Sequence, residues 1–231
     1  MSTALALPRV VAIGFNKCAT RSLAQLFAAA GHPALHQKVP QRWLFSRASR
    51  RRRKLGGIMR ANLEAGRSVF AGVEHAVFYG DLIDSNQRFS FDGNGLFREI
   101  LRDYPNTILL LNWRNREDWI RSRLQHGHGE FALREQRVRG LGSEEELCVL
   151  WRAEWDAHLA AVRSFMADRP DQLVEFNIDT DPIEALIARL PAYGLRPEHY
   201  GDIGRSRGRR LPAWLRAAKR WLTHHRPRAQ R

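Results

Sequence analysis

The sequence of 231 residues is poor in cysteine and has no long hydrophobic run. Its two cysteines, Cys18 and Cys148, do not indicate a disulfide framework, and this scarcity is typical of a reducing compartment. No uncharged apolar stretch reaches the length of a membrane span, and residues 1–8 lack the basic start, apolar centre and cleavage site of a signal peptide. We therefore expect a cytoplasmic chain without a membrane-spanning segment.

Acidic residues are missing from two segments. Residues 42–54 carry seven basic residues and residues 204–231 carry ten, and neither segment holds an aspartate or a glutamate. The remainder has 21 basic and 24 acidic residues, so the net charge of +14 is regional. In the second segment, leucines and tryptophans recur at helical spacing among arginines. This pattern is typical both of a helix on an anionic membrane surface and of a terminal helix docked on the domain.

Nucleic acid is a third candidate partner for such arginine blocks, because they bind phosphate backbones without regard to fold. No recognisable nucleic-acid-binding module supports that interpretation, so we do not expect nucleic acid as a partner. The tail is instead a candidate contact with the inner face of the membrane.

Length and pattern indicate a single domain. With 44% hydrophobic residues, the chain has enough apolar material for an ordinary globular core. Strand patterns alternate with helix patterns, which predicts an α/β fold, a parallel β-sheet flanked by helices, with ligands at the carboxyl ends of its strands. We expect the domain to cover residues 1–203 and a basic amphipathic tail to cover residues 204–231.

The most informative local pattern lies near the start of the chain. Residues 10–13 are apolar and mostly β-branched, as in a strand buried on both faces, and Gly14 ends them. A helical pattern begins at Thr20, so the loop between them lies at a helix N-terminus, where unpaired N–H groups and the helix dipole favour an anion. Lys17 and the hydroxyls of Thr20 and Ser22 make this loop a candidate phosphate cradle.

Two familiar phosphate-binding loops do not fit these residues. An ATP-binding Walker loop has glycine directly before the lysine and Ser or Thr after it, whereas Asn16 precedes Lys17 and Cys18 follows it. A cysteine phosphatase loop has an arginine six residues after the cysteine, where this sequence has Ala24. The alternative without a binding function is an ordinary turn with a surface lysine. Beside that lysine and a helix N-terminus, we expect the thiol pKa of Cys18 to be lowered.

A second strand pattern, residues 107–112, runs into a helical pattern that begins at about Glu117. Arg114 stands at the strand end and Ser122 follows one or two turns into the helix, so a guanidinium and a hydroxyl could meet one phosphate. The alternative is a solvated basic face whose ion pairs with Asp118 contribute little. That face would comprise Arg114, Arg116, Arg121 and Arg123.

The first loop resembles that of the sulfotransferases that use 3′-phosphoadenosine 5′-phosphosulfate (PAPS). In that family a loop of the type Lys-x-Gly-Thr-x-Ser follows the first strand and binds the 5′-phosphosulfate, and Lys17, Thr20 and Ser22 match it. The resemblance implies that the donor contacts the whole loop, namely Lys17, Cys18, Ala19, Thr20, Arg21 and Ser22. Ala19 departs from the family's usual glycine, so a methyl group stands where the backbone approaches the phosphate.

The second motif resembles the family's 3′-phosphate site, an Arg-Asn pair with a serine eight residues after the arginine. Arg114, Asn115 and Ser122 fit this pattern, and residues 174–179 are similar to the family's late strand and acidic turn. The weaker resemblance extends over about residues 10–176. It implies a P-loop NTPase-like three-layer sandwich and PAPS as the donor.

Sulfuryl transfer to a hydroxyl needs a base for the acceptor proton and positive charge at the departing 5′-phosphate. Lys17 can supply the charge. The family's base varies in position, so none transfers by resemblance; Asp81 and His36 are the leading candidates, with Glu74 behind them. A monoanionic sulfuryl group does not demand a divalent cation, by analogy with phosphoryl transfer, and we expect no metal to be required.

The remaining patterns predict scaffold. Residues 68–73 read as one strand and residues 172–178 as another. Ser143 and Glu146 form a capping-box pattern before a long apolar stripe that includes Trp151, which predicts a helix packed on the core.

The sequence-based hypothesis is a PAPS-dependent sulfotransferase that acts on a hydroxyl or amine of a small-molecule or glycan acceptor. A carbohydrate or lipid-linked acceptor is favoured, and a peptide and a small alcohol stay open as alternatives. One alternative is a nucleotide-dependent kinase of the same broad fold, which the missing Gly-Lys-Ser/Thr disfavours. The other is a non-catalytic basic module that binds anionic glycans or membrane through its arginine segments.

Overall fold

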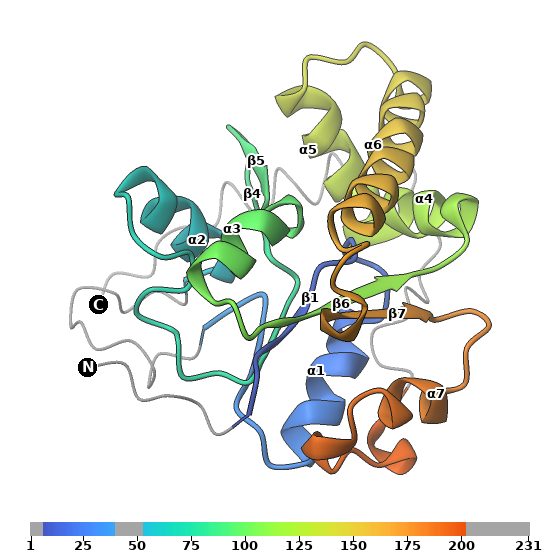
Figure 1. Cartoon of the computed structure of the whole chain (residues 1–231). Coiled ribbons are helices and arrows are strands. Elements are labelled where there is room, and N and C mark those ends of the chain that lie inside the picture. The colour runs from blue at the N-terminus through green and yellow to red at the C-terminus, as the bar shows by residue number, and fades with distance from the viewer. Residues whose placement is uncertain (1–6, 40–52, 202–231) are drawn as a thin grey trace, which may run out of the picture.

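The computed structural model describes residues 7–39 and 53–201. The basic tail and most of the basic block at 42–54 lie outside the described residues. Figure 1 shows a central five-stranded sheet with the strand order β2-β3-β1-β6-β7, in which every neighbouring pair is parallel. The strands are β1 (Val10–Ala12), β2 (Ala34–His36), β3 (Phe78–Gly80), β6 (Ile108–Trp113) and β7 (Leu173–Asn177). The predicted parallel α/β sheet is thus confirmed.

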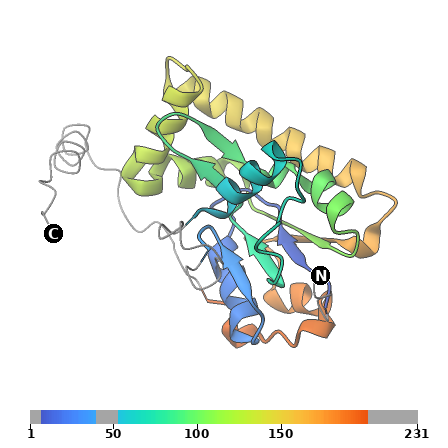
Figure 2. The same cartoon turned by 90° about the vertical axis from the view of Figure 1, so that its left-hand side faces the viewer.

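Helices cover both faces of the sheet, and β1 shows why. Because successive strand side chains point to opposite faces, Val10 and Ala12 join one apolar core while Val11 joins another. The first core includes α1 (Thr20–Ala29) and α7 (Ile183–Ala188). Figure 2 shows these helices on one side of the sheet and α6 on the other. The second core takes in α2 (Leu55–Glu64), α3 (Phe97–Asp103), α4 (Arg116–Gln125), α5 (Glu130–Val138) and α6 (Glu144–Phe165).

The longest helix, α6, begins after the predicted cap. Ser143 Oγ accepts a hydrogen bond from the backbone N–H of Glu146 at 3.1 Å, while the Glu146 carboxylate accepts from the N–H of Gly142 rather than from that of Ser143. Only one half of the expected capping box therefore forms. Trp151 and Trp155 are buried in the core, as predicted for a helix packed on the sheet.

Residues 68–73 form turns, so the strand predicted there is wrong. The apolar run is nevertheless buried, because the ring of Phe70 stacks on Tyr79 with 4.1 Å between centroids. The backbone N–H of Val69 donates to the side chain of Asp103 at 2.9 Å instead of to a neighbouring strand. A short apolar run is compatible with either arrangement, and the true third strand lies a few residues later at Phe78–Gly80.

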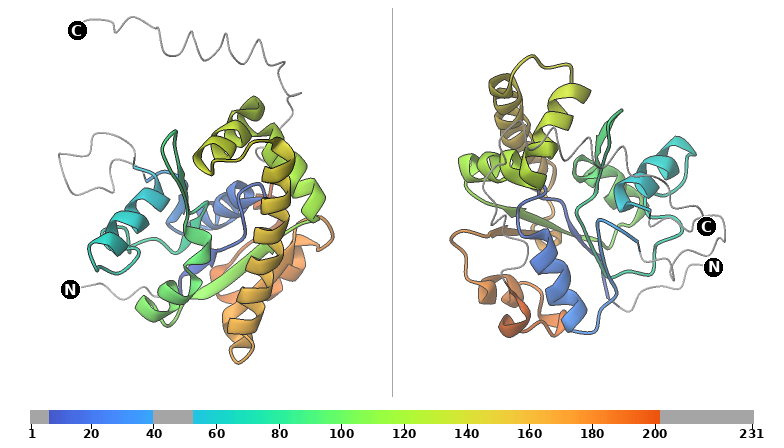
Figure 3. Two further views of the ribbon diagram at one scale, coloured as in Figure 1. Left: turned by 90° about the horizontal axis from the view of Figure 1, so that it is seen from above. Right: turned by 180° about the vertical axis from the view of Figure 1, so that it is seen from behind.

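A small antiparallel hairpin, β4 (Ile83–Ser85) and β5 (Ser90–Asp92), stands beside the main sheet. Figure 3 shows it between α2 and α5. Five short 3-10 helices complete the described secondary structure: Gly93–Gly95, His126–Gly129, Pro170–Gln172, Pro191–Tyr193 and Pro197–His199. Within the described ranges, no helix combines the length and the apolar character needed to cross a bilayer.

Candidate active site

The carboxyl edge of the sheet carries most of the predicted site residues. His36 ends β2, Asp81 follows β3 and Arg114 follows β6, and parallel strands bring these ends to one edge. A cavity of about 920 Å³ opens there. The predicted residues that line it are Lys17, Ala19, Thr20, Arg21, Ser22, His36, Asp81, Arg114 and Ser122. Two motifs far apart in the sequence therefore share one cavity.

Two predicted residues lie elsewhere. The Cys18 side chain is fully buried in the apolar core, and this burial raises the pKa of its thiol, so the expected lowering is wrong. Glu74 precedes β3 and lies near the amino edge of the sheet, where its carboxylate accepts a hydrogen bond from the Tyr104 hydroxyl at 3.4 Å. It does not line the cavity, which removes it as a candidate base.

Asn112, a buried residue of β6, fixes both ends of the loop that follows β1. Its Oδ1 accepts a hydrogen bond from the backbone N–H of Gly14 at 3.0 Å, and its Nδ2 donates to the carbonyl oxygen of Cys18. A Cβ at Gly14 would lie 1.7 Å from the carbonyl oxygen of Asn112, so only glycine allows this close approach. The sequence pattern identifies Asn112 only as a strand residue. The one feature that indicates its role is a polar side chain at the end of an apolar run.

The loop backbone is strained. Lys17 has φ 73° and Ala19 has φ 57°, in the left-handed region that L-residues other than glycine rarely adopt. Each such residue costs roughly 1–2 kcal/mol. The loop holds this conformation because its ends are bound by Asn112 and because Trp119 of α4 donates its indole N–H to the carbonyl oxygen of Asn16 at 3.0 Å.

Three polar side chains connect the loop to β2 and β3. Thr20 Oγ1 lies 3.1 Å from Nε2 of His36, and the same nitrogen lies 3.8 Å from Oδ2 of Asp81. In the tautomer that carries its proton on Nε2, His36 donates to Thr20 and leaves the threonine O–H for an anion in the cavity. The side chains thus form a chain from Asp81 through His36 to the first residue of α1.

Burial sets the protonation states of this chain. It lowers the pKa of His36 to about 4, with a further contribution from the Arg21 charge, so the imidazole is neutral at pH 7. Burial and the nearby Asp92 raise the pKa of Asp81 to about 6, against the opposing charges of Arg21, Lys17 and Lys54. At pH 7 most Asp81 side chains are therefore ionised and able to accept a proton.

The Lys17 ammonium lies in the same electrostatic environment. Burial lowers its pKa, the charges of Arg21 and Arg114 lower it further, and Asp81 raises it. The carboxylate and the cations thus act on one another across the cavity. An added anion between Lys17 and Arg21 would relieve the repulsion between these two positive charges.

Arg114 and Asn115 are organised by the turn after β7. Arg114 Nη2 lies 3.1 Å from Oδ1 of Asp179, and the backbone N–H of Asn115 donates to Oδ2 of the same carboxylate at 2.8 Å. The Asn115 side chain caps α4 by accepting hydrogen bonds from the N–H groups of Glu117 and Asp118. Arg114 Nε is buried and has no hydrogen-bond partner among the described residues.

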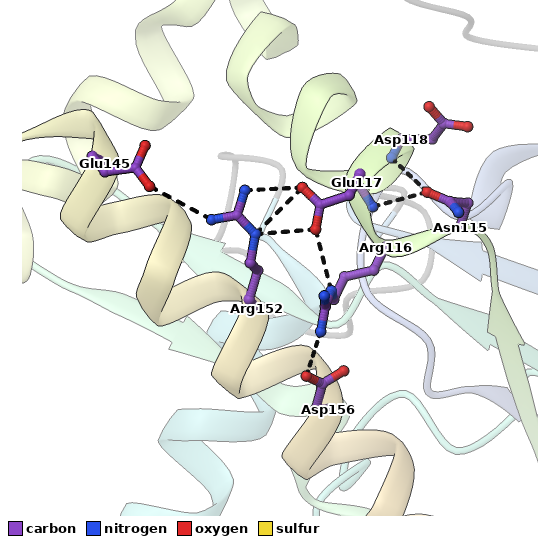
Figure 4. A network of polar contacts seen from close by, with 7 residues as sticks. All are labelled: Asn115, Arg116, Glu117, Asp118, Glu145, Arg152 and Asp156. Carbon is purple, nitrogen blue, oxygen red and sulfur yellow. Dashed lines mark hydrogen bonds and ion pairs between the residues drawn. The ribbon is translucent and has the colours of Figure 1, made fainter.

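The outer side of α4 is held to α6 by ion pairs, as Figure 4 shows. Arg152 Nη2 lies 2.9 Å from Oε2 of Glu117, and Arg116 contacts both Glu117 and Asp156. Arg152 also reaches Glu145 at 3.7 Å. This network attaches the first turn of α4 to the middle of a long helix.

The expected solvated basic face exists only in part. Arg116 and Arg121 lie in surface ion pairs, the latter with Asp118 at 2.8 Å. Arg123 is instead buried against aromatic rings, with its guanidinium carbon 4.5 Å from the ring centre of Trp151. Arg114 and Arg121 both line the cavity, Arg116 does not, and Arg123 is buried, so the four arginines do not share one solvated face.

Within residues 7–39 and 53–201, no group of three or more His, Cys, Asp and Glu side chains is arranged to hold a metal ion. In comparisons with known proteins, no family model matches the chain and no curated protein matches it.

Proposed function

We propose that this protein is a sulfotransferase that transfers the sulfuryl group of PAPS to a hydroxyl or amine of an acceptor. The observation that carries the proposal is the common cavity: Lys17, Thr20 and Ser22 after β1 and Arg114 and Ser122 after β6 line it together. β1 and β6 are adjacent parallel strands, so one nucleotide with phosphates at two positions can meet both motifs.

The residues present fit such a donor. Cations and hydroxyls of the first loop suit a 5′-phosphosulfate, and a guanidinium with a serine hydroxyl suits a 3′-phosphate. Arg114 Nε, a buried donor on a cavity-lining residue, has no hydrogen-bond partner among the described residues. Because an unpaired buried N–H is costly, this favours a site completed by a ligand that offers an acceptor.

The α/β fold is compatible with the proposal. β1 stands at the centre of a parallel sheet with helices on both faces, and its loop leads into α1 at the carboxyl edge. This arrangement is the one expected of a P-loop NTPase-like three-layer sandwich, with a loop that differs from the ATP-binding Walker sequence.

Each residue then has a role. Bound PAPS supplies the activated sulfuryl group. The Lys17 ammonium stabilises the negative charge that grows on the departing 5′-phosphate. The Asp81 carboxylate takes the proton of the acceptor hydroxyl, because it is ionised at pH 7 and lines the same cavity. Neutral His36 orients the Thr20 hydroxyl, and Arg114 with Ser122 holds the 3′-phosphate.

Calorimetric titration with 3′,5′-adenosine bisphosphate (PAP), with 5′-AMP as the comparison and no added metal, tests the proposal. We expect PAP to bind at least about tenfold more tightly than 5′-AMP, and Arg114→Ala to remove that preference. Arg163→Ala, which breaks a surface ion pair with Glu175, is the control that should change nothing. Equal affinity for the two nucleotides contradicts the proposal, and binding that requires ATP with Mg²⁺ supports the kinase alternative.

A kinetic comparison tests Lys17 separately. Lys17→Met should lower kcat more than it lowers PAP affinity, because the charge matters most when the leaving phosphate develops charge. The exposed Lys38 provides the matched control, Lys38→Met. Equal losses in turnover and binding would reduce Lys17 to a binding residue.

A further inference from the structure

The cavity wall formed by β4 and α5 contains an arginine that belongs to neither motif. Arg134 lines the cavity together with Ile83, Ser85 and Phe131. Its Nε donates to Ser85 Oγ at 3.0 Å, and its guanidinium carbon lies 5.2 Å from the ring centre of Phe131. These two contacts restrict the position of the guanidinium at the wall.

The support beneath this arginine is itself fixed. Ser85 Oγ donates to Oε1 of Glu135 at 2.7 Å, and Glu135 is fully buried. The same carboxylate accepts hydrogen bonds from Ser90 at 3.0 Å and from Nε of Arg139 at 3.3 Å. The hydroxyl that holds Arg134 is therefore preorganised, which reduces the cost of ordering the guanidinium when a ligand binds.

Arg134 differs from the two arginines that follow it in the sequence. Arg139, directly after α5, forms ion pairs with Glu135 and Glu154, and Arg137 donates to the side chain of Gln87 at 2.7 Å. Among the described residues, no carboxylate forms an ion pair with Arg134. Within the part of the chain that the structure describes, the hydrogen bond of Arg134 is made by Nε, and a half-buried guanidinium of this kind is suited to bind an anion through its terminal nitrogens.

Arg134 is also electrostatically close to the first loop. Burial, followed by the charges of Lys17 and Arg134, lowers the pKa of His126 to about 4. Both cations thus act on one imidazole of the cavity wall, and both line the same cavity. Asp81, the proposed base, lines the cavity as well.

We propose that Arg134 binds a carboxylate or phosphate group of the acceptor, so that the protein acts on acidic acceptors such as uronic acids or sugar phosphates. This inference rests on the proposed function and specifies its acceptor. The donor's two anionic ends occupy Lys17 and Arg114, and Arg134 provides a third position for negative charge. A neutral sugar leaves this guanidinium without an anion and binds more weakly.

Calorimetry on the full chain saturated with PAP provides the test, with glucuronate, inorganic phosphate and neutral glucose as probes. We expect at least one anion to bind at least about fivefold more tightly than glucose, and Arg134→Gln to abolish that preference. Arg137→Gln, on the same helix but outside the cavity lining, should retain it. A preference for glucuronate indicates a carboxylate acceptor, and a preference for phosphate indicates a phosphorylated one.

The inference is overturned if neither anion is preferred over glucose, or if Arg134→Gln leaves the preference intact. Arg134→Lys keeps the positive charge but lacks the planar guanidinium, so its affinity for the anion should be intermediate. This variant provides a second measurement if Arg134→Gln is poorly folded. Failure of the proposed function is recognised separately, because PAP would then show no advantage over 5′-AMP while an Arg134-dependent preference for anions could still be measured.

Discussion

The two proposed phosphate-binding regions of the cavity differ in how they are held in place. The loop at residues 14–20 is fixed from inside the protein, by the buried Asn112 and by the indole of Trp119. The motif at residues 114–122 packs on the core through the buried Trp119 and Ile120, and it has in addition an outer support, namely the exposed cap Asn115 and ion pairs between α4 and α6. The polar support of the first region consists of buried hydrogen bonds, whereas the outer support of the second consists of exposed charges that water and salt weaken.

This difference indicates how each region responds to change. Buried hydrogen bonds hold a strained backbone because leaving their partners unpaired is costly. We therefore expect the loop at residues 14–20 to tolerate few substitutions. The outer motif can lose single contacts at small cost. The part that would face the reacting group is thus the more rigid, and the part that would hold the 3′-phosphate is the more adjustable.

The largest expected effect comes from the matched pair Asn112→Ala and Asn115→Ala. The first change leaves the N–H of Gly14 and the carbonyl of Cys18 buried without partners and should lower the free energy of unfolding by about 2–4 kcal/mol. The second removes an exposed helix cap and should cost about 1 kcal/mol. Urea unfolding measures both, and equal losses would contradict the distinction between inner and outer support.

A second prediction concerns pH. Folding raises the pKa of Asp81 from 3.8 to about 6, so the ionised carboxylate destabilises the folded state above that range and the protonated one does not. Asp81→Asn should therefore stabilise the protein by about 1–3 kcal/mol at pH 8, a gain that disappears as the pH falls from about 6 to 4. Asparagine also tolerates the φ of 56° at this position.

The same substitution should lower kcat by about a hundredfold if Asp81 is the base. Wild-type kcat/KM should rise with pH to a plateau above about 6, as Asp81 ionises. Asp156→Asn is the outer control: it loses a surface ion pair with Arg116 and should neither stabilise the protein nor change turnover. A stabilised Asp81→Asn variant with full activity would confirm that ionised Asp81 destabilises the fold and would contradict its role as the base.

A third prediction concerns strain in the loop. Ala19→Gly relieves a left-handed alanine, a gain of roughly 1–2 kcal/mol that the greater freedom of unfolded glycine partly offsets, so we expect a net stabilisation below about 1 kcal/mol. PAP affinity should rise severalfold, because no methyl group stands between the backbone and the phosphate. Ala28→Gly, at an exposed position of α1, should destabilise by about 1 kcal/mol. The same sign for both variants would show that φ at Ala19 is not strained.

Much of the site could be predicted because a parallel sheet brings the ends of its strands together. Lys17 and Arg114 each follow an apolar strand, so the sequence alone predicts that they lie at one edge, and the cavity contains both. The start of α1 at Thr20 could be predicted for a related reason, since a polar turn and a helical period adjoin there.

The rest could not be predicted because it depends on contacts between distant segments. The thiol of Cys18 adjoins a lysine in sequence but points into the core, so its pKa rises instead of falling. The buried turn at residues 68–73 has the composition of a strand, and only its packing on Tyr79 distinguishes the two. Asn112 and Arg134 act through hydrogen bonds to residues far along the chain, which no local pattern records.

The smallest expected effect comes from Glu117→Gln, which removes the carboxylate charge from the outer network and keeps a side chain of nearly the same size. The Arg152 hydrogen bond lowers the pKa of Glu117, so its stabilisation is present at neutral pH and is lost as the pH falls through that lowered pKa. The side chain is exposed, so the loss of stability should be the smallest of the series and should vanish in about 0.5 M salt, where the Debye length is short. Asn112→Ala should keep its full effect in the same salt, because buried hydrogen bonds are not screened. Urea unfolding of both variants at low and high salt therefore separates the two kinds of support, and a salt-independent loss in Glu117→Gln would contradict the assignment of the Glu117–Arg152 ion pair to the exposed, screened kind.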